Sequence, residues 1–188
     1  EKLTMVMPPM DMNIYIPDPA AVVELNFGDH WRARWVETDT LPKGAPLTYG
    51  YVVVCMGDKG YLTREKGAER FGTVGGPVPE GETAAAWLKR TVMEQTGVTP
   101  GRIELLGYFD CRATSHNPDY EAGAATVRPV YLVSAKSIKD LGASSRYERR
   151  RMPMNEFAVE IRKRHPEVDS QLQTAINTHM TLFLRGEV

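Results

Sequence analysis

The chain has 188 residues, of which 42% are hydrophobic and 25% are charged, as is ordinary for a folded globular protein. Its 23 lysines and arginines against 24 acids give a net charge of −1, which argues against general nucleic-acid binding, because that requires a basic surface. No apolar run approaches the roughly 18 residues of a membrane span, and the N-terminal residues show no signal-peptide pattern. Cys55 and Cys111 make no disulfide framework. We therefore expect one cytoplasmic domain over residues 1–188, without membrane contact.

The predicted elements begin after an irregular arm rich in methionine and proline, residues 1–20. Strands are predicted over residues 22–27, 31–37, 49–56 and 61–65. The third is a continuous β-branched run, typical of a strand buried on both faces, and a tight turn links it to the fourth. Because the segment 22–37 is apolar and aromatic, we expect it to extend a sheet or to build a homodimer interface.

Glycine and proline dominate residues 66–82, which predicts a loop. Residues 83–96 then predict a helix, because Ala85, Leu88 and Val92 recur three and four positions apart, and Gly97 is placed to end it. Strands at 103–112 and 127–135 follow, then a charged stretch at 146–151 and helices at 155–164 and 168–184. This order predicts an α+β fold rather than a regularly wound βαβ sheet.

Residues 76–98 carry the most specific pattern in the chain: Gly76, Glu82, Arg90, Val92, Glu94, Gly97 and Val98. Their spacing resembles the Nudix box, which reads glycine, five residues, glutamate, seven residues, then Arg-Glu-apolar-x-Glu-Glu-x-Gly-apolar. The resemblance covers residues 49–135, the C-terminal helices (150–188) suit the family, and residues 1–46 are an unmatched N-terminal extension with extra strands. It implies the Nudix fold, an α/β/α sandwich around a mixed β-sheet, with helix 83–96 on one side and the C-terminal helix on the other.

Two of the three glutamates that hold metal in the family are replaced here by Thr91 and Gln95, and only Glu94 remains. At about 100° per residue these three positions share one helix face. Trp87, one turn earlier, lies on the same side, and we expect its bulk to narrow the site. Glutamine has the shape of glutamate without its charge, so a pocket keeps its form and loses most of its attraction for a cation.

The resemblance implies hydrolysis of a pyrophosphate bond in a nucleoside diphosphate derivative, with Mg²⁺ or Mn²⁺ neutralising the phosphate oxygens. The candidate catalytic residues are Glu94, Glu82 and Arg90, with Glu94 also the metal ligand, and the candidate substrate-binding residues are Gly75, Gly76, Thr91 and Gln95. Magnesium often uses one or two carboxylates plus substrate phosphates, so we expect weak, substrate-dependent metal binding and low turnover. The candidates for a general base are Asp110, Asp119, Glu121 and Glu148, each of which is otherwise a solvated acid.

The alternative function is a catalytically inactive Nudix-fold module that binds or senses a nucleotide-like ligand. The residues at positions 91 and 95 favour this alternative, whereas the register of the box favours the hydrolase. A third, weaker possibility is an enzyme that works without the usual metal cluster. The arginines of the charged stretch, at positions 146, 149, 150 and 151, are either a phosphate clamp or a solvated charge run.

Overall fold

The computed structural model describes residues 23–27 and 29–188, so position 22 of the first predicted strand and the arm before it lie outside the described residues. Eight strands form one mixed sheet in the order β1-β2-β6-β7-β3-β4-β8, with β5 paired to β3 off this path. The strands are β1 (Val23–Phe27), β2 (Trp31–Glu37), β3 (Tyr49–Met56), β4 (Lys59–Glu65), β5 (Val74–Pro77), β6 (Val98–Ala113), β7 (Ala125–Ile138) and β8 (Tyr147–Pro153). The helices are α1 (Ala84–Thr96), α2 (Met154–Arg164), the short 3-10 helix η1 (Pro166–Val168) and α3 (Asp169–Leu184).

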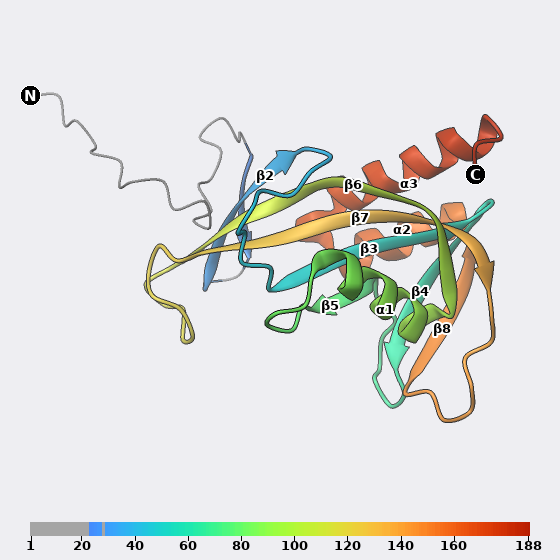
Figure 1. Ribbon diagram of the computed structural model, residues 1–188, viewed down its shortest axis with the longest axis horizontal. Coiled ribbons are helices and arrows are strands. Elements are labelled where there is room, and N and C mark those ends of the chain that lie inside the picture. Colours follow the sequence, from blue (N-terminus) through green and yellow to red (C-terminus); the bar gives the residue numbers. More distant parts are fainter. Residues whose placement is uncertain (1–22, 28) are drawn as a thin grey trace, which may run out of the picture.

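Helices cover both faces of this sheet, with α1 on one side and α2 and α3 on the other (Figure 1). The α+β class and the α/β/α sandwich are therefore confirmed, as is the helix predicted over residues 83–96. Thr83 caps that helix by accepting a hydrogen bond from Ala86 N at 3.2 Å, and Gly97 ends it in a left-handed conformation with φ of 74°. Among the described residues, no helix is long and apolar enough to cross a membrane.

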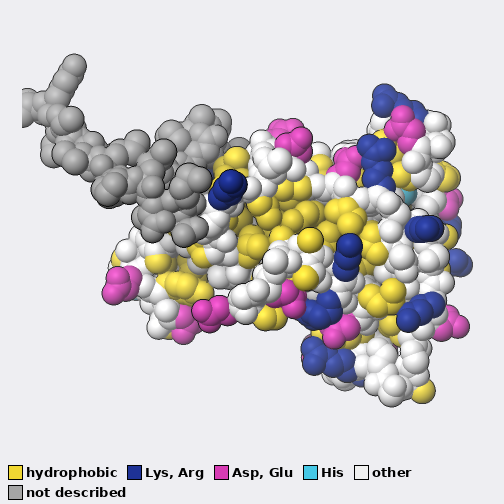
Figure 2. Space-filling model, in the orientation of Figure 1, with side chains coloured by type: hydrophobic (Ala, Val, Ile, Leu, Met, Phe, Trp, Pro, Cys, Tyr) yellow, Lys and Arg dark blue, Asp and Glu magenta, His cyan; other side chains and the backbone are white. Residues whose placement is uncertain are grey.

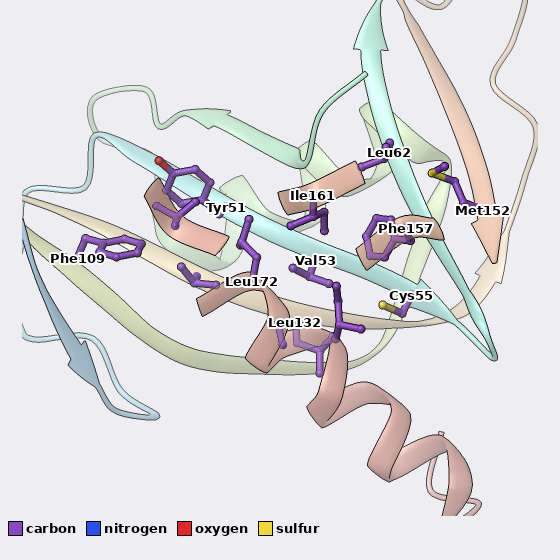
Figure 3. Packing of buried hydrophobic residues seen from close by; sticks show 14 of the residues in the cluster. Tyr51, Val53, Cys55, Leu62, Phe109, Leu132, Met152, Phe157, Ile161 and Leu172 are labelled. Atoms are coloured by element: carbon purple, nitrogen blue, oxygen red, sulfur yellow. The ribbon is translucent and has the colours of Figure 1, made fainter. Parts of the chain in front are cut away.

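Strand β3 lies at the centre of the sheet and is buried on both faces, as its β-branched sequence predicts. Val52 and Val54 pack against α1, in a core cluster of their own. Val53 and Cys55 point the other way, toward α2 and α3 (Figure 3). The strand runs parallel to β7, with Val53 opposite Leu132. Two hydrophobic cores, one on each face, therefore hold the helices to the sheet.

Strands β5 and β8 were not predicted, because residues 66–82 were expected to form a loop and 146–151 a charged stretch. β5 is a short glycine-containing segment paired antiparallel with β3, and Gly76 lies opposite Gly50. β8 pairs antiparallel with β4 and forms one edge of the sheet. Lys and Arg side chains gather over this end of the molecule (Figure 2), and such charges at an edge strand oppose pairing with another chain.

The N-terminal strands extend the sheet, which is the first of the two alternatives predicted for them. β1 pairs with β2, and β2 pairs with β6. Trp31 and Trp35, four residues apart on β2, both pack on the core that faces α2 and α3, and Trp35 lies 4.9 Å from Phe109 between ring centroids. A homodimer interface stays a prediction.

His179 ties the C-terminal helix to the centre of the sheet. Its imidazole is buried on α3, with Nδ1 2.7 Å from Ser134 Oγ on β7 and Nε2 2.7 Å from the Gly57 carbonyl in the β3–β4 turn. A neutral ring satisfies both contacts when Nε2–H donates to Gly57 and Nδ1 accepts from the hydroxyl. Burial lowers the pKa of His179, and the hydrogen bond to Gly57 opposes that shift.

We expect the free energy of unfolding to fall as the pH drops through about 6.5, the ordinary pKa of histidine. Because the pKa of His179 is lower in the folded protein, the unfolded chain binds more protons below that pH, and acid favours unfolding. Urea unfolding at about pH 7.5 and about pH 5.5, on either side of that pKa, measures the loss. The variant His179→Gln keeps a donor and an acceptor and should lose less. His165, whose pKa burial also lowers, contributes the remainder, and equal losses in the two proteins would contradict the assignment to His179.

Candidate functional site

The glycines that open the box lie in β5, beside the buried strand β3. Tyr51 is opposite Gly75, and Gly50 is opposite Gly76. Gly75 has a φ of 144°, and a Cβ at this position would lie 2.2 Å from the Gly50 carbonyl oxygen. No other residue type fits there without moving β3. Gly75 is therefore fixed by the close approach of two backbones.

The side chain of Gln95 is bonded to Gly75 through both of its polar atoms. Its Nε2 donates to the Gly75 carbonyl at 2.8 Å, and its Oε1 accepts from the Gly75 N–H at 3.1 Å. Gln95 is 7% exposed and Thr91 is 3% exposed, so both side chains face the interior of the protein. The face shared by Thr91 and Gln95 thus points inward, whereas Glu94, which was predicted to share it, lies exposed on the outer side of α1. A contact of Thr91 or Gln95 with a ligand stays a prediction.

Glu82, Arg90 and Glu94 form an ion network on the outer side of α1. Arg90 binds Glu82 through Nε and Nη2, at 2.9 Å for the shortest contact, and its Nη1 lies 3.1 Å from Glu94 Oε2. The hydrogen bonds with Glu82 raise the pKa of Arg90 above its ordinary value. About half of the Glu94 side chain is exposed. The network ties the loop before α1 to the helix, while the catalytic roles of Glu82, Arg90 and Glu94 stay predictions.

Trp87 is buried between α1 and β3 and does not project into a site. It is 1% exposed, and its Nε1 donates to the Pro77 carbonyl at 3.1 Å. The indole occupies the space that a side chain at position 50 would need, because a Cβ on Gly50 would lie 2.3 Å from Trp87 Cη2. The expectation that Trp87 narrows a site is therefore wrong: it lies on the same side as positions 91 and 95, and that side is part of the core.

The far end of α1 is also held tightly. Arg149 on β8 donates to the Thr96 carbonyl at 2.6 Å and to the Lys139 carbonyl. A guanidinium at this position satisfies a terminal carbonyl of the helix and complements the negative end of its dipole. A Cβ on Gly97 would meet the Lys139 carbonyl oxygen at 2.2 Å. Arg149 thus binds two backbone carbonyls through Nη1, whereas Arg150 and Arg151 are exposed.

The box residues do not fit a divalent metal in this arrangement. Thr91 faces the core, Gln95 directs an amide N–H₂ at the Gly75 carbonyl, and Glu94 is bound to Arg90. Within the described part of the chain, no group of three or more His, Cys, Asp or Glu side chains is placed to hold a metal ion. Magnesium requires oxygen ligands. Here the Gly75 carbonyl oxygen already accepts a hydrogen bond from Gln95 Nε2, an N–H₂ group that cannot bind magnesium. We therefore derive no chemical step through a metal at this position.

The four candidate general bases are dispersed. Asp110 is buried and bound by Arg34 at 3.5 Å and by Arg112 at 3.2 Å. Glu148 is bound by Arg64 at 2.8 Å. Asp119 and Glu121 lie exposed in the loop between β6 and β7. The structure selects none of the four as a base, and that role stays a prediction.

A row of aromatic and cationic side chains lies on the face of the sheet opposite to α1, close to the strand that carries the box glycines. We call it the aromatic cluster: Tyr120, Trp31, Arg128, Tyr49 and Tyr51. Trp31 lies 5.1 Å from Tyr120 between ring centroids, and the Arg128 guanidinium carbon lies 5.7 Å from the Trp31 ring and 5.5 Å from the Tyr49 ring. Tyr49 and Tyr51 are 5.3 Å apart. On β3 these two tyrosines stand opposite Pro77 and Gly75, so the aromatic cluster adjoins the box.

Burial raises the pKa of Tyr51 to about 12, and the positive charge of Arg128 opposes that shift. Burial likewise raises the pKa of Tyr49. Both phenols therefore stay protonated at neutral pH. His165, just before η1, lies 6.3 Å from Tyr51 between ring centroids, and its Nε2 accepts from Thr73 N at 3.1 Å.

The aromatic cluster is not evident from the sequence, because its members come from segments far apart in the chain. The signals were the alternating tyrosines at the start of β3 and the exposed aromatic ring, Tyr120, in a polar loop. Trp31, Tyr49 and Arg128 are half-buried and Tyr120 is 42% exposed, so part of the cluster is accessible to a ligand.

Comparison with known proteins agrees with this architecture. The sequence profile of the NUDIX domain matches residues 46–172. The chain therefore belongs to the NUDIX domain family. A search of curated proteins found no match.

Solved structures similar to this chain include three bacterial proteins. The pyrophosphohydrolase BsRppH of Bacillus subtilis is 16% identical, with a TM-score of 0.53 over 70% of this chain and 77% of that one. The Mutator MutT protein from Bacillus halodurans is 16% identical, with a TM-score of 0.50 over 68% and 80%. The NUDIX domain of Shewanella oneidensis NrtR, solved with ADP ribose, is 19% identical, with a TM-score of 0.48 over 72% and 89%. At these identities the likeness concerns the fold.

The stability of the box region should depend on Trp87 far more than on Arg90. Trp87→Ala removes a fully buried ring and should lower the free energy of unfolding by about 3–5 kcal/mol. Arg90→Ala removes partly exposed ion pairs, which solvent screens, and should cost about 1 kcal/mol or less. Urea unfolding monitored by circular dichroism compares the two variants. Similar losses in the free energy of unfolding would contradict this expectation, because they would show that the outer ion network stabilises the region as much as Trp87 does.

Proposed function

We propose that this NUDIX domain binds a nucleotide-like ligand and does not hydrolyse it through metal held by the box. One observation carries the proposal: an accessible aromatic and cationic cluster adjoins a box whose inward positions are neutral. Tyr49 and Tyr51 stand directly opposite Pro77 and Gly75 on neighbouring strands. Such strands lie about 5 Å apart. A ligand on the cluster would therefore lie beside the strand that carries the box glycines.

The chemistry of the cluster suits a planar ring that carries negative charge. A nucleobase stacked on an aromatic side chain is stabilised by about 1–3 kcal/mol. Arg128, between the Trp31 and Tyr49 rings, adds a positive charge and planar donors that match phosphate oxygens. Burial, and to a smaller extent the negative charge of Glu167 in η1, raise the pKa of both tyrosines, so their hydroxyl groups stay protonated as donors.

The neutral box argues for binding over turnover. Hydrolysis of a pyrophosphate bond depends on cations that offset the charge developing on the phosphate oxygens. Thr91 and Gln95 supply no charge at the positions where the family has carboxylates, and Glu94 is bound to Arg90. A ligand held by stacking and by a guanidinium requires no metal.

Calorimetry with ADP in the presence of EDTA tests ligand binding. We expect binding without metal, and Tyr49→Ala or Arg128→Met should weaken it by about 10-fold or more, the loss expected for one stacking or cation–π partner. The matched control is the pair Arg146 and Tyr147, another guanidinium stacked 5.0 Å from a tyrosine ring but outside the cluster. Tyr147→Ala and Arg146→Met should leave the affinity unchanged. Binding that needs Mg²⁺, or equal effects in both pairs, would count against the proposal.

The second candidate is a pyrophosphohydrolase of low turnover, as first suggested by the box. The Glu82–Arg90–Glu94 network favours it, because the outer half of the box is complete. The release of nucleoside monophosphate from ADP, ADP-ribose and nucleoside triphosphates should be measured with Mn²⁺ and with EDTA. We expect weak divalent binding without substrate and little release. Release that requires Mn²⁺ and disappears in Glu94→Gln would favour this candidate over the binding module.

A further inference from the structure

Gln95 contacts Gly75 as one peptide group contacts another in a sheet. The amide offers a donor to the Gly75 carbonyl and an acceptor to the Gly75 N–H, at 2.8 Å and 3.1 Å. The two hydrogen bonds close a ring between α1 and β5. Both groups of Gly75 are thereby satisfied by one side chain that is 7% exposed.

A glutamate of the same length would not make this ring. Its second carboxylate oxygen would face the Gly75 carbonyl oxygen at hydrogen-bond distance, and two acceptors repel each other. Only a proton or a cation between them removes that repulsion, because a buried and unpaired carboxylate is costly. The Nε2 group of Gln95 therefore stands where a glutamate would need a cation.

We propose that Gln95 is a metal-replacing latch: its amide holds β5, at Gly75, to α1 in the place that a divalent cation would otherwise fill. The identity of residue 95 alone then decides whether this junction requires a cation. The latch joins β5 to α1, and its role does not depend on which ligand the protein binds.

The latch is anchored at both ends, which makes the position of the amide fixed. The Thr63 hydroxyl on β4 donates to the Gln95 backbone carbonyl at 3.1 Å. Arg149 holds the following carbonyl, that of Thr96. On the loop side, Thr73 N is bound to His165, next to the aromatic cluster. Residues 73–75 thus contact Gln95 on the α1 face of the sheet and His165 on the face covered by α2 and α3. The Gln95 amide therefore also helps to position the contact with His165.

Thermal unfolding with EDTA, Mg²⁺ or Mn²⁺ tests the latch without any nucleotide. The natural protein should show the same midpoint in all three conditions. Gln95→Glu in EDTA should unfold about 4–8 °C lower, because a buried hydrogen-bonding group has lost its partner. Millimolar Mn²⁺ or Mg²⁺ should recover at least half of that loss. Gln95→Ala should also unfold lower, but it should not respond to either cation.

Asn177→Asp is the matched control, since it adds a carboxylate at an exposed position of α3. It should respond to neither cation. A midpoint of the natural protein that rises with Mn²⁺ would overturn the proposal. A Gln95→Glu chain that gains nothing from Mn²⁺, whether it is folded or unfolded in EDTA, would also overturn it. Loss of ADP binding with an intact latch would instead contradict only the proposed function.

Discussion

The burial of β3 on both faces is the constraint from which the rest of this structure follows. Val52, Val53 and Val54 have no exposed surface, so apolar layers must cover the sheet from both sides. The edges of the strand are used as fully as its faces. β7 pairs along one edge, while β4 and β5 share the other, β4 beside residues 54–56 and β5 beside residues 49–52. The chain therefore returns to β3 after the hairpin, and that return places the box glycines at the centre of the molecule.

The position of the glycines then determines which chemistry is stable at the inner face of α1. A carboxylate at position 95 would be almost fully buried and would meet a carbonyl, so it would need a proton or a cation to offset its charge. An amide meets the same carbonyl with a donor and needs neither. The neighbouring inward residue, Thr96, is also satisfied locally, through a 2.6 Å hydrogen bond to the Val92 carbonyl. The side chains of Gln95 and Thr96 are thus uncharged and hydrogen-bonded within the protein.

The sequence allowed the central strands and the main helices to be predicted, because their apolar periodicity is set by burial on one or both faces. It also located the box, whose spacing is fixed by one loop and one helix. It could not identify β5 or β8 as strands, since one is glycine-rich and the other arginine-rich. Their conformation comes from pairing with β3 and β4. Helical spacing showed that positions 91 and 95 share a face, but not that the face points inward. Trp87, an apolar residue one turn earlier, carried that information.

A match to the box motif combines two kinds of information: how the loop and helix are arranged, and which chemistry the residues can perform. In this chain the two are separate. From outside α1, Arg90 binds Glu82 and Glu94 and so holds the loop of residues 77–82 to the helix. From inside, Gln95 holds Gly75. Protein groups alone thereby hold both β5 and the loop that follows it to α1, so their conformation requires no metal. The spacing of the motif reports this architecture, and a solved structure of only 16% sequence identity shares the fold. The chemistry depends instead on the residue types at positions 91 and 95. The fold accepts neutral or charged side chains at these positions, provided that each buried polar group has a partner.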